Sequence, residues 1–158
     1  MIKAVFLDWF NTLACYEPPR EELQSQAIQE FGFEVSPEKI LPGLMAADRY
    51  FFGENANSPV GKRSPREQAE VYIHYQEIIL TEAGVKADQG LLLKIMKRTE
   101  QLFEGITFTL FDDALSALKT LKERKLILGL LTNLDKDMNP ICRKLGLEPY
   151  LDFVVTSG

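Results

Sequence analysis

Two short motifs place polar side chains where apolar segments end, a position from which they could act on a substrate. One apolar segment ends at Asp8, with Thr12 four residues later, and another ends at Thr132 and Asn133. A carboxylate can attack carbon or phosphorus and form a covalent intermediate. Hydroxyl and amide groups can stabilise the charge that develops on substrate oxygens. The residue types therefore predict nucleophilic catalysis by Asp8, assisted by Thr132 and Asn133.

Both apolar segments are typical of strands in a parallel sheet. Residues 4–7 and 126–131 are continuous apolar runs, which predict strands buried on both faces. The carboxyl ends of parallel strands meet at one edge of the sheet, where α/β proteins bind ligands. We therefore expect Asp8 to lie beside the tip formed by Thr132 and Asn133. We also expect it to be buried, which is costly for a carboxylate without a partner or a chemical role.

The stretch between the two motifs has the pattern of four helices. Helix-capping sequences precede three of them, at Ser36, at Ser64 and at Asp88. Residues 53–63 contain Gly, Asn and Pro and predict a loop. From residue 106 onward, helical and strand patterns alternate, which is typical of parallel strands with right-handed crossovers.

These patterns predict an α/β fold with two domains. Residues 1–14 and 106–158 form a parallel, Rossmann-like core in which three strands are present. Residues 15–105 form a four-helix bundle inserted after the first strand.

Composition excludes several classes of function. The chain has 158 residues, a net charge of −5 and two cysteines. The negative charge argues against a nucleic-acid partner, which would need clustered Lys and Arg. No apolar stretch approaches the roughly 20 residues of a membrane span, and the N-terminus does not read as a signal peptide. We expect a cytoplasmic protein that binds a small-molecule substrate and neither a membrane nor a nucleic acid.

Asp8, Thr12 and Leu13 match the first motif of the haloacid dehalogenase (HAD) superfamily, Asp-x-x-x-Thr-Leu, and residues 126–133 resemble its second motif. The resemblance implies that Asp8 is the nucleophile and that residues 15–105 are a helical cap of the first type. Thr12 either orients Asp8 through its hydroxyl or satisfies the backbone of the turn.

The second motif also leaves two roles open. Thr132 and Asn133 either hold substrate oxygens or cap a helix that begins near Asp135.

The resemblance also implies that the core is incomplete. HAD-like sheets have at least five strands, and the family supplies a Lys and one or two carboxylates after the position that matches Thr156. We therefore expect an N-terminal portion of a larger protein, inactive by itself. Its first strand would lie at the sheet edge and associate with other chains, so a homodimer is one expected assembly.

The side chain of Phe10 bears on which HAD-like reaction the chain would catalyse. HAD-like phosphatases carry a second Asp two positions after the nucleophile, where this chain has Phe10. A halide leaving group needs no proton, so the resemblance favours a metal-free 2-haloacid dehalogenase. The alternative is a phosphatase whose Mg²⁺ is bound by Asp8 and the carbonyl of Phe10. A further alternative is a HAD-fold domain that binds without catalysis.

Three residues are candidates for contacts with the substrate. Trp9 and Phe10 follow the nucleophile, and Arg49 in the bundle either clamps a substrate carboxylate, as a cap Arg does in haloacid dehalogenases, or is a solvated surface residue. Asp8-Trp9 also resembles the opening of phosphonoacetaldehyde hydrolases, in which a cap Lys forms a Schiff base. Lys39 would be that residue here.

Overall fold

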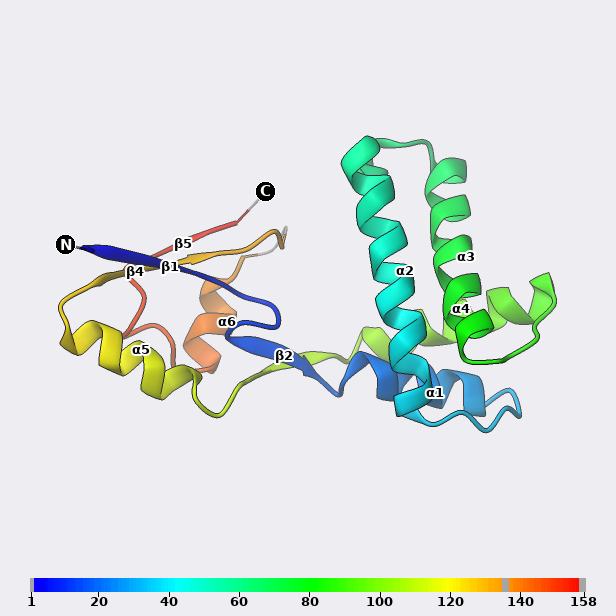
Figure 1. Ribbon diagram of the computed structural model, residues 1–158, viewed down its shortest axis with the longest axis horizontal. Coiled ribbons are helices and arrows are strands. Elements are labelled where there is room, and N and C mark those ends of the chain that lie inside the picture. The colour runs from blue at the N-terminus through cyan, green and yellow to red at the C-terminus, as the bar shows by residue number, and fades with distance from the viewer. Residues whose placement is uncertain (1, 135–136, 157–158) are drawn as a thin grey trace. The chain divides into compact units, whose positions relative to one another are not determined.

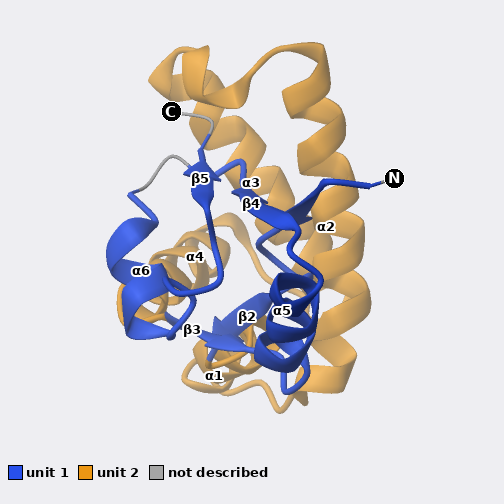
Figure 2. Cartoon of the chain, turned by 90° about the vertical axis from the view of Figure 1, so that its left-hand side faces the viewer, with its two compact units in different colours: residues 1–17, 107–158 blue, residues 18–106 orange. Residues whose placement is uncertain are grey.

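A computed structural model describes residues 2–134 and 137–156 of the chain (Figure 1). The chain divides into two compact units, residues 1–17 with 107–158, and residues 18–106 (Figure 2). The sequence placed these divisions after residues 14 and 105. The first unit extends further because residues 14–17 pair with a strand that begins at Thr107.

The first unit contains a parallel sheet of three described strands in the order β1-β4-β5. The strands are β1 (Ala4–Asp8), β4 (Ile127–Leu131) and β5 (Phe153–Val155). The crossovers between them contain α5 (Ala114–Glu123) and α6 (Asn139–Lys144), which lie on the same side of the sheet (Figure 1). This arrangement agrees with the parallel α/β core that the sequence predicted.

One face of this sheet forms the core of the first unit. Leu128 and Leu130 of β4 are fully buried there, together with Leu118 of α5. Val5 and Leu7 of β1 pack against the same cluster. Side chains alternate between the faces of a strand, so every second residue of β1 and β4 lies on this covered face.

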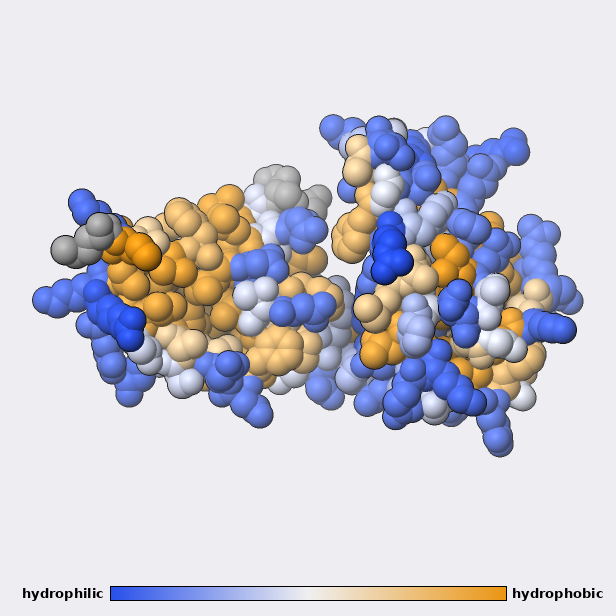
Figure 3. All heavy atoms as spheres, viewed as in Figure 1, coloured by the Kyte–Doolittle hydropathy of each residue, from blue (hydrophilic) through white to orange (hydrophobic). Residues whose placement is uncertain are grey.

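The opposite face of the sheet, which we call the open face, is exposed. Its apolar side chains are Phe6, Ile127, Leu131, Phe153 and Val155. Figure 3 shows apolar side chains gathered over this unit. The expectation that β1 and β4 are buried on both faces is therefore wrong, because the described helices of this unit cover one face alone. β1 also lies at the edge of the described sheet, with β4 as its partner.

A second, antiparallel pair of strands joins the two units. β2 (Ala14–Glu17) pairs with β3 (Thr107–Leu110), and Glu17 lies opposite Thr107. The Thr107 hydroxyl also donates to the carbonyl oxygen of Glu17 at 3.2 Å. This ribbon was not predicted from the sequence, and the helical unit is inserted after β2 rather than after β1.

The second unit is helical throughout its described core. Its elements are α1 (Arg20–Gln29), α2 (Pro37–Asn57), the 3₁₀ helix η1 (Val60–Lys62), α3 (Pro65–Glu82) and α4 (Gln89–Phe103). The helices bury a separate apolar cluster that includes Ile28, Ile40, Ile79 and Ile95. A four-helix unit was predicted from the sequence. None of the described helices is both long and apolar enough to span a membrane.

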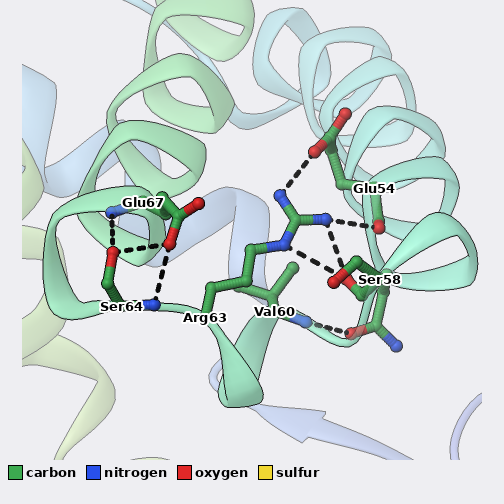
Figure 4. A network of polar contacts seen from close by, with 7 residues as sticks. Glu54, Ser58, Val60, Arg63, Ser64 and Glu67 are labelled. Atoms are coloured by element: carbon green, nitrogen blue, oxygen red, sulfur yellow. Dashed lines mark hydrogen bonds and ion pairs between the residues drawn. The ribbon is translucent and has the colours of Figure 1, made fainter.

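Local sequence explains where these helices begin. Ser64 and Glu67 form a capping box: the Ser64 amide donates to Glu67 Oε2 at 2.9 Å, and the Glu67 amide donates to the Ser64 hydroxyl (Figure 4). At the start of α4, the Leu91 amide donates to Asp88 Oδ1 at 2.8 Å. Both caps confirm predictions from the sequence.

The end of α2 differs from the prediction. A loop was expected over residues 53–63, but α2 continues to Asn57. Arg63 stabilises this last turn, since its guanidinium donates to Glu54 Oε2 at 2.6 Å and to the carbonyl oxygens of Glu54 and Ser58 (Figure 4). Basic side chains near a helix C-terminus satisfy carbonyls that have no partner within the helix.

Candidate active site

Asp8 is the last residue of β1 and lies at the carboxyl end of the parallel sheet. The Thr12 hydroxyl donates to Asp8 Oδ2 at 3.3 Å. Asp8 is exposed, which contradicts the expectation of a buried carboxylate. The reason is its position in the strand: Asp8 alternates with Leu7 and therefore belongs to the open face.

The second motif lies on the neighbouring strand at the same edge. Asp8 pairs in register with Leu131, and Thr132 is the next residue along β4. Paired positions on adjacent strands are separated by about 5 Å, so the backbone brings the two motifs together.

Thr132 follows β4, and it is buried and hydrogen-bonded at this strand end. It is 8% exposed, and its amide donates to the Val155 carbonyl at 3.0 Å. Its hydroxyl oxygen accepts from the Leu134 amide at 3.2 Å, so the hydroxyl proton can still be donated. Asn133 is exposed beside it. Asp135, where a helix was expected to begin, lies outside the described residues, and α6 begins at Asn139.

A tight turn carries the chain from Asp8 to β2. The amides of Leu13 and Ala14 donate to the Trp9 carbonyl at 3.0 and 3.1 Å, and the Asn11 amide donates to the Ala14 carbonyl at 2.8 Å. Asn11 has a φ of 59°, in the left-handed region that Asn tolerates better than most residues. The backbone of the turn is thus satisfied largely by backbone atoms, which leaves the Thr12 hydroxyl to contact Asp8.

Trp9 does not line the candidate site. Its side chain is fully buried and packs edge-on against Phe108 of β3, with ring centroids 5.3 Å apart. The prediction that Trp9 contacts substrate conflicts with this burial. Val5, Leu7 and Trp9 occupy alternate positions, so a period of two would have placed Trp9 on the covered face. Its Nε1 atom is buried without a hydrogen-bond partner.

Phe10 belongs to a small aromatic group in the first unit. Its ring packs against Tyr16 of β2 at a centroid distance of 4.5 Å, and Tyr16 in turn stacks on Phe108 at 5.2 Å. Phe10 is half-buried. Tyr16 and Phe108, which hold this ring, were not predicted from the sequence. The alternating pattern of residues 107–110 is nevertheless a strand signal.

The remaining candidates lie in the other unit. Arg49 and Lys39 are both on α2 and both exposed. Asp8 belongs to the first unit. The expected contacts of Arg49 and Lys39 with substrate stay predictions.

Asp8 and the Phe10 carbonyl are oxygen ligands of the kind that Mg²⁺ prefers. Mg²⁺ commonly takes one or two carboxylates and keeps several waters, so this pair fits one part of a magnesium site. In residues 2–134 and 137–156 there is no group of three or more His, Cys, Asp and Glu side chains that could hold a metal by itself.

An ion pair lies near the amino-terminal ends of β4 and β5, opposite the end of the sheet that carries Asp8. Lys122 donates to both carboxylate oxygens of Asp152 at 2.9 and 2.8 Å, and the Leu128 amide donates to Asp152 Oδ2 at 2.7 Å. The hydrogen bond from Lys122, followed by that from the Leu128 amide, lowers the pKa of Asp152 below its ordinary value. This contact joins the start of β5 to β4, the strand that leads to Thr132.

Solved structures share this fold at low sequence identity. An L-2-haloacid dehalogenase is 18% identical with a TM-score of 0.55, over 98% of this chain and 63% of its own. A HAD family hydrolase from Deinococcus radiodurans R1, with bound phosphate and sodium, is 14% identical with a TM-score of 0.57. The match covers 98% of this chain and 58% of that protein. A protein described as a predicted phosphoglycolate phosphatase from Haemophilus somnus 129PT is 12% identical with a TM-score of 0.53. The match covers 98% of this chain and 62% of that protein.

These likenesses show the fold alone, and the chain spans about three fifths of the length of each structure. A comparison with curated protein sequences gave no match. A family model of haloacid dehalogenase-like hydrolases matches residues 2–158. With that match over nearly its whole length, the chain belongs to the haloacid dehalogenase-like hydrolase family, as the motifs at Asp8 and Thr132 predicted.

Proposed function

We propose that Asp8 is the nucleophile in the hydrolysis of a small organic substrate through a covalent aspartyl ester. The observation that carries this proposal is the position of Asp8 at the carboxyl end of β1, bonded to the Thr12 hydroxyl and one strand away from Thr132. In this arrangement Asp8 is accessible to a substrate. Thr132 and Asn133 extend from the same edge, where their polar groups would hold substrate oxygens.

The favoured substrate is a 2-haloacid. An Asp8 oxygen attacks the carbon that bears the halogen, the new C–O bond forms, and the halide leaves with the bonding electrons. Water then adds to the carbonyl carbon of the ester, which releases a 2-hydroxyacid and a proton and restores the carboxylate. Phe10 supports this choice, because an alkoxide leaving group would need a proton that a Phe side chain does not carry.

The alternative is a Mg²⁺-dependent phosphatase in which Asp8 attacks phosphorus. Asp8 and the Phe10 carbonyl would hold the ion, which would offset the negative charge of a phosphate group. The solved structures that share this fold include one described as a predicted phosphatase and one of a dehalogenase. The leaving alcohol would then depend on water for its proton, so we expect a slow phosphatase.

A third possibility is that this fold binds a ligand without catalysis. It is favoured by the surroundings of Asp8: in the described part of the chain, no Lys, Arg or His forms an ion pair with it. A nearby cation would stabilise the carboxylate once substrate displaces water. Without such a cation we expect Asp8 to attack a substrate slowly, and no attack at all would indicate the binding domain.

The test is designed for the first half-reaction. The protein is incubated with 2-chloropropionate, with and without EDTA, and the ester is located by peptide mass spectrometry while free chloride is measured. We expect label on Asp8 and an equivalent amount of chloride, both unaffected by EDTA. Parallel incubation with a phosphomonoester measures phosphate release and its dependence on Mg²⁺.

Asp8→Asn should abolish both labelling and chloride release, whereas Asp112→Asn, at an exposed carboxylate in the same unit, should retain them. Chloride release that persists in Asp8→Asn would overturn the proposal. Label confined to Cys15, a partly exposed thiol, would also argue against it. Mg²⁺-dependent phosphate release without chloride release would favour the phosphatase, and no reaction with either substrate would favour the binding domain.

A further inference from the structure

The helical unit contains a cavity of its own, separate in the chain from the motifs around Asp8. Its volume is about 540 Å³, within the range of roughly 300–1,000 Å³ that is usual for small-molecule sites. Residues of α1, α2, α3 and α4 line it, so it lies within one compact unit.

Two buried side chains on its wall have hydrogen-bond donors without partners. Gln24 of α1 is 2% exposed and Gln76 of α3 is 4% exposed, and the Nε2 atom of each has no hydrogen-bond partner. Buried polar groups are nearly always paired, because an unpaired one loses its bonds to water and gains nothing in return. An acceptor-bearing molecule beside Gln24 and Gln76 would satisfy both donors, as would a bound water.

The charged side chains at the cavity do not favour an anion. Arg20 lines the cavity, but its guanidinium contacts the Asp48 carboxylate at 2.6 and 3.2 Å. The Tyr75 hydroxyl donates to Asp48 Oδ1 at 2.7 Å. Burial and this hydrogen bond raise the pKa of Tyr75, so its phenol is neutral. Glu100, which also lines the cavity, adds a negative charge.

The rest of the lining is largely apolar or aromatic. Leu44, Tyr72, Met96 and Phe103 contribute to it. Aromatic and thioether side chains pack well against flat rings. The lining thus matches a molecule with an apolar, planar body.

We propose that this cavity binds a small uncharged molecule that has an aromatic or similarly flat apolar body and a carbonyl oxygen facing Gln24 and Gln76. The carbonyl would accept hydrogen bonds from the two amide groups, and the flat body would lie among the apolar side chains. This proposal is independent of the hydrolysis proposed for Asp8.

Benzamide is a suitable probe, with benzoate and toluene as matched compounds that add a charge or remove the acceptor. Binding is followed in the full chain by the ¹H–¹⁵N signals of the glutamine side-chain amides. We expect benzamide to shift the signals of Gln24 and Gln76 and to bind more tightly than either control compound. This measurement uses the unmodified protein, so it does not depend on whether a variant folds.

Gln24→Met and Gln76→Met each remove one donor while keeping an unbranched side chain. We expect each to weaken benzamide binding by about three- to tenfold, the usual effect of one hydrogen bond. Gln26→Met, on the exposed side of α1, should leave the affinity unchanged.

Three results would overturn the proposal. The first is no shift of either glutamine signal at millimolar benzamide. The second is equal binding of toluene, which would mean that the donors have no role. The third is unchanged affinity in both methionine variants, which would place the probe elsewhere and leave the two amides to bound water.

Discussion

The hydroxyl of Thr12 donates a hydrogen bond to Oδ2 of Asp8 over 3.3 Å. This contact spans four residues and exists because the backbone amides after Asp8 bond to the carbonyls of Trp9 and Ala14. The contact leaves one carboxylate oxygen, Oδ1, without this hydrogen bond. We infer that the Thr12 hydroxyl orients Asp8 rather than satisfying the backbone of the turn.

Removal of this hydroxyl should slow the reaction of Asp8. Thr12→Val keeps the branched shape and loses the donor, so we expect alkylation of Asp8 by 2-chloropropionate to fall by about three- to tenfold. Thr12→Ser keeps the donor and should react at close to the original rate. Equal rates for the two variants would show that the hydroxyl does not position Asp8.

Two glycines of α2 should respond in opposite directions to substitution by alanine. A Cβ on Gly43 would lie 2.9 Å from the Ile79 carbonyl oxygen and 3.0 Å from its Cα, so α2 and α3 would have to separate. We expect Gly43→Ala to lower the free energy of unfolding by roughly 1–3 kcal/mol. Gly53 has nothing within 4 Å, and Gly53→Ala should raise it by about 0.5–1 kcal/mol through helix propensity. Urea unfolding measures both, and a loss of similar size at the two positions would contradict the close approach at Gly43.

The contact between Lys122 and Asp152 should stabilise the first unit in a pH-dependent way. The pKa of Asp152 is lowered in the folded state. Its contribution to the free energy of unfolding is therefore fully present above the ordinary carboxyl pKa of about 4. That contribution is lost as the pH falls through the pKa of the folded state. Asp152→Asn should therefore lower the melting temperature at pH 7, and the difference from the unmodified protein should shrink below about pH 4.

Glu148→Gln is the matched control for that measurement. Its partner Arg143 lies 3.4 Å away, and both side chains are largely exposed. Such surface pairs contribute little, so we expect almost no change in melting temperature at either pH. A difference for Asp152→Asn that does not vary with pH would exclude the titration as its cause.

The open face and the edge of β1 should promote self-association. Phe6 is 58% exposed on this edge strand, and unpaired strand edges with apolar side chains are templates for pairing with another chain. We expect the protein to associate at high concentration in sedimentation velocity, and Phe6→Lys to reduce this association. Met45→Lys, at an equally exposed apolar residue of α2, should have less effect. Association that persists unchanged in Phe6→Lys would place the contact elsewhere.

Much of the fold could be predicted from local sequence. Continuous apolar runs identified β1 and β4, and capping residues located the starts of α3 at Ser64 and α4 at Asp88. These signals succeed because each depends on the chemistry of neighbouring residues alone. The meeting of Asp8 and Thr132 followed from the same reasoning, since parallel strands end at one edge.

The features that were not predicted from the sequence depend on contacts between residues that are distant in the chain. β2 and β3 have four residues each, and the hydrogen bonds of this ribbon join segments about 90 residues apart in the chain. The last turn of α2 contains Gly53 and two asparagines, which are poor helix formers, and it is stabilised by Arg63 from beyond the helix. Arg49 was a candidate because haloacid dehalogenases have a cap Arg that clamps the substrate carboxylate, and this contact stays a prediction.

The ribbon of β2 and β3 has a consequence for how this chain can vary. Because Glu17 and Thr107 face each other, the first and last residues of the 18–106 segment leave the ribbon from neighbouring positions. A segment whose ends are held side by side can be lengthened, shortened or replaced without disturbing the strand that carries Asp8. The architecture therefore lets the sheet that carries Asp8 be recombined with different helical modules, so that the two units can evolve separately.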